Sequence, residues 1–257
     1  MVALRSLIKQ AGLLAAMSVA SVSSHAFSIT LDTTLLQANS TLTLTQTAMQ
    51  AMSAIGVSLS AGGYATNLGN NSAGLAQYNI PVTSLTANIS LFPLSLAPTQ
   101  AKTAGSTLSL TSAASPGLGG GGSATISNML INFSNDTIFG SVTSDSGTVN
   151  NVGLFTFNVT KPLTFSLNGG ISLTESLGNL TLTQNAATML TSDLKYPSFL
   201  AGTFQALNFG SIDAKIVPWF RSTPLGSVNP VPEPSTYAIL AVGLGLAGVA
   251  ARRRKAS

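Results

Sequence analysis

The sequence predicts an all-β protein, either an antiparallel β-sandwich or a barrel-like domain, with one or two short helices. Polar and apolar residues alternate in short runs between residues 27 and 220, as in strands that bury one face. Clusters of glycine, asparagine and proline separate these runs, as turns do. Hydrophobic residues make up 45% of the chain and charged residues 7%, so a body of about 200 residues can bury one sizeable core. A signal helix and a C-terminal hydrophobic helix are expected outside this body.

The first 26 residues have the layout of a secretory signal peptide. Arg5 and Lys9 form a charged start, residues 11–22 are mostly apolar and small, and Ser24-His25-Ala26 supplies small residues for cleavage. This order predicts export, with residues 1–26 removed after Ala26 and Phe27 as the new N-terminus. The alternative is an amphipathic helix of the mature fold.

Strands are expected where threonine alternates with apolar residues. The clearest runs are Thr41–Gln46, Ser106–Thr111, Phe155–Thr160, Leu163–Leu167 and Asn179–Gln184. Further strands are expected at Val82–Leu91, Ala124–Phe133, Ile138–Val142 and Leu207–Val217. The expected breaks are Gly62-Gly63, Gly69–Asn71, Pro98, Ser115–Ser123, Asp145–Gly147 and Asn168–Gly170. Ser146-Gly147 and Asn168-Gly169 are suitable pairs for tight hairpins.

Two short helices are expected, at Thr47–Ile55 and Asn185–Asp193. Each follows the end of a Thr-Leu-Thr-Gln run, and the two runs lie 138 positions apart. A duplicated strand-and-helix unit and chance similarity in a Leu- and Thr-rich chain both explain this spacing.

Two segments have the composition of connections. Ser115–Ser123 holds five glycines in nine residues and is expected to be a mobile loop, or a boundary between two domains. Residues 221–230 contain prolines and are expected to be an extended linker after the β-rich domain of residues 27–220.

The charge distribution argues against nucleic acid as a partner. The net charge of +4 comes from the two ends, because residues 27–230 hold five Lys or Arg and six Asp or Glu. The body has no basic patch of the kind that binds phosphates.

The absence of some residue types limits the kinds of active site that the mature protein can contain. There is no cysteine, and the one histidine, His25, lies in the signal peptide. Nucleophilic sites that need histidine or cysteine are therefore excluded from the mature protein, as are zinc sites built from them. We expect no catalytic residues, no metal site and no cofactor.

Three groups of residues in the body are candidate binding sites. Asp136 and Asp145 flank a strand and turn, and we expect turn residues rather than calcium ligands there. The threonine runs are expected on the wet faces of strands rather than in an ice-binding array. An aromatic set is expected to close the core, with sugar stacking as the alternative; it comprises Tyr196, Phe199, Phe204, Trp219 and Phe220.

The C-terminal segment, residues 231–257, has three parts. Val-Pro-Glu-Pro comes first, then 18 uncharged residues between Glu233 and Arg252, then Arg252, Arg253, Arg254 and Lys255. As a helix, 18 residues rise about 27 Å, close to the ~30 Å hydrocarbon core of a bilayer. Residues 235–251 are therefore predicted to form a transmembrane helix, with the basic tail holding the C-terminus in the cytoplasm.

This three-part order resembles the PEP-CTERM sorting signal of Gram-negative bacteria. The resemblance implies that a membrane processing enzyme, the exosortase, recognises Pro232, Glu233 and Pro234 and removes or replaces the hydrophobic tail. A C-terminal segment of this type has also been labelled an ice-binding protein C-terminal domain. The membrane would then hold the protein only before processing.

The resemblance leads to an expected function and two alternatives. It implies an exported protein of the cell surface or of an extracellular matrix of exopolysaccharide and biofilm, without catalysis. One alternative is a secreted polysaccharide hydrolase or lyase that uses carboxylates. The other is an ice-binding surface protein.

Overall fold

The computed structural model describes residues 27–91, 94–166, 172–222 and 225. Its first half contains β1 (Phe27–Asp32), β2 (Leu36–Leu44), α2 (Gln46–Ala54), β3 (Val57–Gly63), β4 (Thr66–Asn70), β5 (Ala76–Pro81), β6 (Ser84–Leu91) and β7 (Leu94–Ser112). Its second half contains β8 (Ser123–Asn132), β9 (Thr137–Ser144), β10 (Gly147–Ser166), β11 (Ser172–Leu182), α3 (Gln184–Asp193), α4 (Leu200–Ala206) and β12 (Gly210–Phe220).

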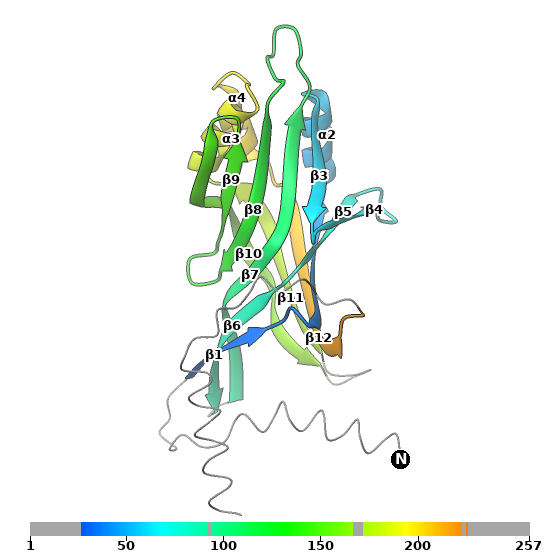
Figure 1. Ribbon diagram of the computed structural model, residues 1–257, viewed down its shortest axis with the longest axis vertical. Helices are drawn as coiled ribbons and strands as arrows, with labels where there is room; N and C mark the ends of the chain where they lie inside the picture. Colours follow the sequence, from blue (N-terminus) through cyan, green and yellow to red (C-terminus); the bar gives the residue numbers. More distant parts are fainter. Residues whose placement is uncertain (1–26, 92–93, 167–171, 223–224, 226–257) are drawn as a thin grey trace, which may run out of the picture.

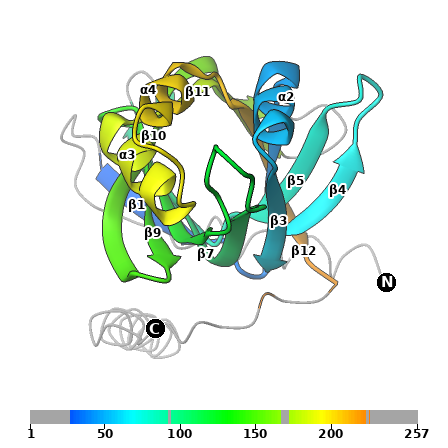
Figure 2. The same cartoon turned by 90° about the horizontal axis from the view of Figure 1, so that it is seen from above.

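The strands form one 12-stranded sheet in the order β1-β6-β7-β8-β9-β10-β11-β12-β2-β5-β4, with β3 on the upper part of β7. The sheet curls into a half-barrel around the core, with α2, α3 and α4 at its upper end (Figure 1). Seen from above, the strands and helices form a ring (Figure 2). The all-β prediction is confirmed, and the barrel-like alternative describes this sheet.

Alternation explains which face of each strand is buried. Along β2, every second residue from Leu36 to Leu44, Ser40 included, is buried, and the residues between them are more exposed. On the outer face, threonines stand opposite one another on paired strands and share hydrogen bonds. These hydroxyl pairs are Thr30–Thr86, Thr143–Thr148, Thr156–Thr181 and Thr164–Thr174, with oxygen–oxygen distances of 2.8–3.0 Å. The threonine runs therefore supply cross-strand pairs on the wet face.

Both expected helices are present, within one residue of their predicted starts. They are α2 and α3. Each follows a strand that ends in leucine, with threonine as the N-cap and glutamine as the first helical residue. The third described helix, α4, was not predicted. It lacks a side-chain hydrogen bond at its N-cap, Phe199, so the usual start signal is missing from the sequence.

One expected break and one gap between predicted strands lie inside long strands. Pro98 belongs to β7, where the register against β6 shifts between Thr86 and Ala87. A bulge lets a residue without an N–H sit in a strand. The runs Phe155–Thr160 and Leu163–Leu167, predicted as separate strands, both fall in the 20-residue β10 as far as Ser166, and Leu167 lies outside the described residues. The pairing of β10 with β11 is irregular around Lys161.

The two ends of the chain fall outside the described residues. This applies to the signal peptide (residues 1–26), to the sorting segment (231–257) and to the predicted transmembrane helix (235–251). Within the described ranges, no helix has both the length and the apolar character needed to cross a membrane. The domain boundaries and the cleavage site between Ala26 and Phe27 stay predictions.

Candidate functional site

Two equivalent corners place the helices over the upper end of the half-barrel. At one, Thr45 follows β2, and its hydroxyl accepts a hydrogen bond from the N–H of Ala48, at 3.1 Å. At the other, Thr183 follows β11 and accepts from Ala186, also at 3.1 Å. Each threonine hydroxyl also donates to a backbone carbonyl of an adjacent segment at 2.6 Å, Thr45 to that of Asn208 and Thr183 to that of Gly153. The same N-cap therefore fixes α2 and α3, and the sequence similarity 138 positions apart has a structural counterpart.

A glycine-rich connection lies over the middle of the ring between these helices (Figure 2). It joins β7 to β8 and contains the run Ser115–Ser123. Gly120 N donates to the carbonyl of Lys195 at 2.9 Å, and Ser112 Oγ donates to the carbonyl of Leu194 at 2.9 Å. The connection is thus hydrogen-bonded to the end of α3, and it joins two strands of one sheet rather than two domains.

Glycine is needed in this connection because the backbones approach closely. A Cβ at Gly122 would lie 2.1 Å from the carbonyl oxygen of Asp193, and one at Gly120 would lie 2.3 Å from that of Ala113. The two helices are also linked across the top, since Tyr196 Oη donates to the carbonyl of Ile55 at 2.5 Å. We call the connection 113–122 together with Tyr196 the lid.

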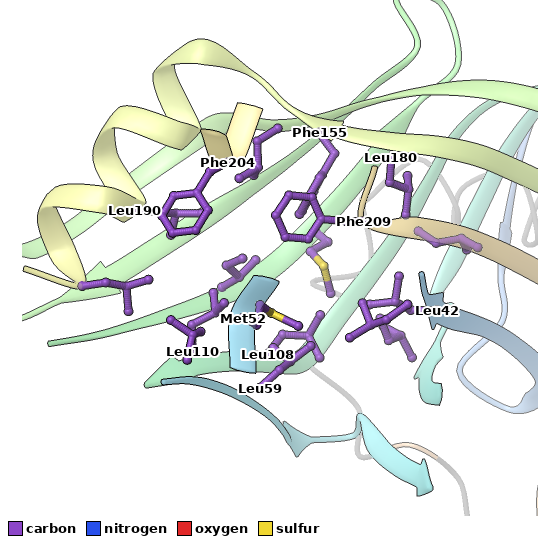
Figure 3. Close-up of a pocket in the computed structure, with 18 residues that line it drawn as sticks. Leu42, Met52, Leu59, Leu108, Leu110, Phe155, Leu180, Leu190, Phe204 and Phe209 are labelled. Carbon is purple, nitrogen blue, oxygen red and sulfur yellow. The ribbon is translucent and has the colours of Figure 1, made fainter. Parts of the chain in front are cut away.

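Below the lid lies a hollow of about 80 Å³ lined entirely by apolar side chains. We call it the upper cavity. Its lining comes from all three helices and from eight strands. Figure 3 shows Phe155, Phe209 and Phe204 facing Leu59 and Leu108 across the space. The rings of Phe155 and Phe209 meet edge to face, with centroids 5.6 Å apart, and this contact stiffens one wall.

A second, smaller hollow lies lower in the half-barrel and contains Glu175. It measures about 20 Å³, enough for about one water molecule, and its lining is apolar apart from Glu175 and Ser40. Glu175 is 6% exposed, and within the described ranges its carboxyl makes no hydrogen bond or ion pair. Burial raises the pKa of Glu175 from 4.5 to about 7, because the charged carboxylate is poorly solvated there.

At the lower end, Arg221 holds the chain where it leaves β12 towards the sorting segment. Its Nη1 donates to Asn39 Oδ1 at 3.0 Å, and its Nη2 donates to the carbonyl of Ala38. Burial lowers the pKa of Arg221. The first residue of the predicted linker is therefore attached to β2.

The structure separates the predicted aromatic set. Tyr196 and Phe204 are buried at the upper end, with ring centroids 6.4 Å apart. Trp219 and Phe220 are exposed at the end of β12, and Phe199 is 70% exposed. No single stacking platform forms from these five residues.

The two aspartates of the predicted turn are also separate. Asp136 has a positive φ of 49°, which suits a turn aspartate. Asp145 pairs with Lys195, with 3.1 Å between carboxylate and ammonium. No group of three or more acidic residues or histidines that could hold a metal occurs in the ranges the structure covers.

The sorting residues Pro232, Glu233, Pro234 and Arg252–Lys255 lie outside those ranges.

Neither hollow was predicted from the sequence. The upper cavity is lined by leucines, methionines and phenylalanines that look like any core residues. The alternation along β11 gave a weak indication that Glu175 is buried. Glu175 occupies an inward position, between Thr174 and Ser176, which point outward. Each of these two residues is hydrogen-bonded to a side chain on the outer face.

Comparison with known proteins identifies the C-terminal segment. Residues 230–255 match the model of the PEP-CTERM protein-sorting motif, which confirms the resemblance found in the sequence. The chain therefore carries the signal of exported proteins that an exosortase processes. No curated protein matches the chain.

Two solved structures are similar to the body. One is the C-terminal domain of HtaA from Corynebacterium glutamicum, with a TM-score of 0.42 and 13% identity over 71% of this chain and 98% of that domain. The other is the heme binding protein HtaB from the same organism, with a TM-score of 0.43 and 11% identity over 74% of this chain and 96% of that protein. At this level of similarity, neither a ligand nor an activity can be transferred from these proteins to this chain.

Proposed function

We propose that this chain is a non-enzymatic protein of the cell surface or extracellular matrix of a Gram-negative bacterium, delivered there through its C-terminal sorting signal. The match of residues 230–255 to the sorting motif carries the proposal. In this scheme the exosortase recognises Pro232, Glu233 and Pro234, and the basic tail Arg252–Lys255 keeps the C-terminus in the cytoplasm until the tail is removed.

Exopolysaccharide is the proposed contact of the delivered body. The outer face of the sheet carries hydroxyl pairs and few charges, which suits neutral, hydroxylated surroundings.

The hydrolase or lyase alternative needs two carboxylates at one site, and Glu175 is the only buried carboxylate of the described residues. The hydroxyl pairs lie on a curved sheet, so ice binding gains no support.

Mass analysis of the exported protein tests the sorting step. In a host with an exosortase, we expect a new N-terminus at Phe27 and loss of the sequence after Pro232-Glu233-Pro234. Replacement of these three residues by alanine should block processing. Pro224→Ala, outside the matched segment, is the control and should be processed normally. An intact Arg252–Lys255 tail on the extracellular protein would overturn the proposal.

A glycan-binding screen of the processed protein tests the contact. Binding to a matrix polysaccharide is expected, with little change on raising the salt concentration, because the body carries few charges and these nearly cancel. Absence of binding to every glycan would contradict the exopolysaccharide contact and leave the sorting step intact.

A further inference from the structure

We propose that the upper cavity binds the hydrocarbon chain of an uncharged, single-chain amphiphile, such as a long-chain alcohol or a monoacylglycerol, which enters between β3 and β5. This binding site goes beyond the proposed sorting and matrix role.

The chemistry of the lining selects the buried part of the ligand. All of the side chains around the upper cavity are apolar, so a water molecule there finds no hydrogen-bond partner, and the space favours hydrocarbon. Leu59, Leu110, Phe155 and Phe209 are only partly buried although they face the interior. Their accessible surface is apolar area that a bound chain would cover.

The shape of the cavity favours a narrow chain. Several strands contribute two successive inward residues, such as Leu42 with Leu44 and Leu108 with Leu110. Inward residues of a strand are about 7 Å apart, so the lining forms two layers along the strands, with helix residues above. The volume of about 80 Å³ is about half that of the engineered cavity of about 150 Å³ that holds benzene. Part of an unbranched chain fits without rearrangement, and Met52 and Met129 can adapt to more of it.

An open groove provides the entrance. β3 pairs only with β7, and β5 pairs with β2 and β4, so β3 and β5 are not joined by strand pairing in the described sheet. The groove of about 390 Å³ at this position shares Leu44, Met52, Val57 and Leu59 with the upper cavity. These four side chains border both the groove and the upper cavity. Met52 has three rotatable side-chain bonds and is the natural gate.

The groove also selects the head group. Its polar residues are Ser53, Ser58 and Tyr78, and Tyr78 Oη donates across the gap to the carbonyl of Leu59 at 3.1 Å. No charged residue lines the groove or the upper cavity in the part of the chain that the structure describes. An alcohol or ester finds hydrogen-bonding groups here, whereas a carboxylate would lose water without gaining a cation.

The first test is calorimetric titration of the processed protein with 1-decanol, with sodium decanoate at pH 8 as the charged counterpart. We expect saturable 1-decanol binding at one site and at least tenfold weaker binding of decanoate. No saturable binding of 1-decanol would overturn the proposal. Equal binding of the two compounds would overturn the assignment of an uncharged head.

Matched substitutions locate the site. Leu110→Phe adds volume inside the upper cavity and should weaken 1-decanol binding at least tenfold. Leu68→Phe is the control, because Leu68 is 53% exposed on β4 and the same change there should leave the affinity unchanged. Equal affinities of the two variants would refute the location. Leu59→Phe, at the wall between groove and cavity, gives the same comparison if Leu110→Phe does not fold.

Discussion

Replacing Glu175 by glutamine should remove most of the pH dependence of stability between pH 5 and pH 8. The pKa of Glu175 is about 7 in the folded protein, against an ordinary value of 4.5. Between these two values the unfolded chain releases a proton that the folded protein keeps. Unfolding is then favoured as the pH rises, so the free energy of unfolding falls.

The magnitude follows from the interval between the two pKa values. About 2.5 pH units at 1.36 kcal/mol each correspond to about 3 kcal/mol, lost progressively as the pH rises from about 4.5 through about 7. Glutamine resembles the protonated carboxyl in shape and does not ionise. Glu175→Gln should therefore match the wild type near pH 4.5 and exceed its stability by about 3 kcal/mol at pH 8.

Urea unfolding followed by circular dichroism at pH 5, 6, 7 and 8 measures this difference. Asp136→Asn is the matched control, because Asp136 lies in an exposed turn and its replacement should leave the wild-type dependence in place. The reasoning about the lower hollow is refuted if the wild type and Glu175→Gln change in parallel across this range.

Four further substitutions test the α3 cap, the lid, α4 and the core. Thr183→Ala removes the N-cap of α3 and its bond to Gly153, and chemical denaturation should show a loss of about 1–2 kcal/mol. Gly122→Ala should lower the melting temperature, because the new Cβ would meet the carbonyl of Asp193. Gly202→Ala, in open space on α4, should instead raise stability by about 0.5–1 kcal/mol. A gain in stability for Gly122→Ala together with a loss for Gly202→Ala would contradict the account of the lid. Leu154→Ala, at a fully buried position, should cost about 2–5 kcal/mol in urea unfolding, and a loss below 1 kcal/mol would show that this part of the core is loosely packed.

The sequence predicted the elements whose signals are local. The Thr-Leu alternation placed β2 and β11, and the two Thr-Gln corners placed α2 and α3. The exposed strand β4 was missed because none of its five residues is buried, so it lacks a buried stripe to reveal it. Pro98 was assigned to a break because a proline normally ends a central strand, and only the pairing with β6 reveals the bulge.

The candidate site was harder to predict because it is defined by distance in space. The sorting signal is contiguous, and its three parts could be recognised in order. The upper cavity instead depends on how residues from eight strands and three helices fail to fill the interior. Hydrophobic content predicts that a core exists, but a small deficit of side-chain volume within it leaves no pattern in the chain.

The attachment at Arg221 has a mechanical consequence. The sorting segment follows β12, and β12 is hydrogen-bonded on both sides, to β11 and to β2. If the protein is held by its C-terminal side, a pull on the chain runs along β12. Because antiparallel hydrogen bonds lie perpendicular to the strands, such a force loads the bonds of both ladders together, in shear, rather than opening them one at a time. A C-terminal attachment would thus load the half-barrel through a strand that is well placed to resist drag from the surroundings.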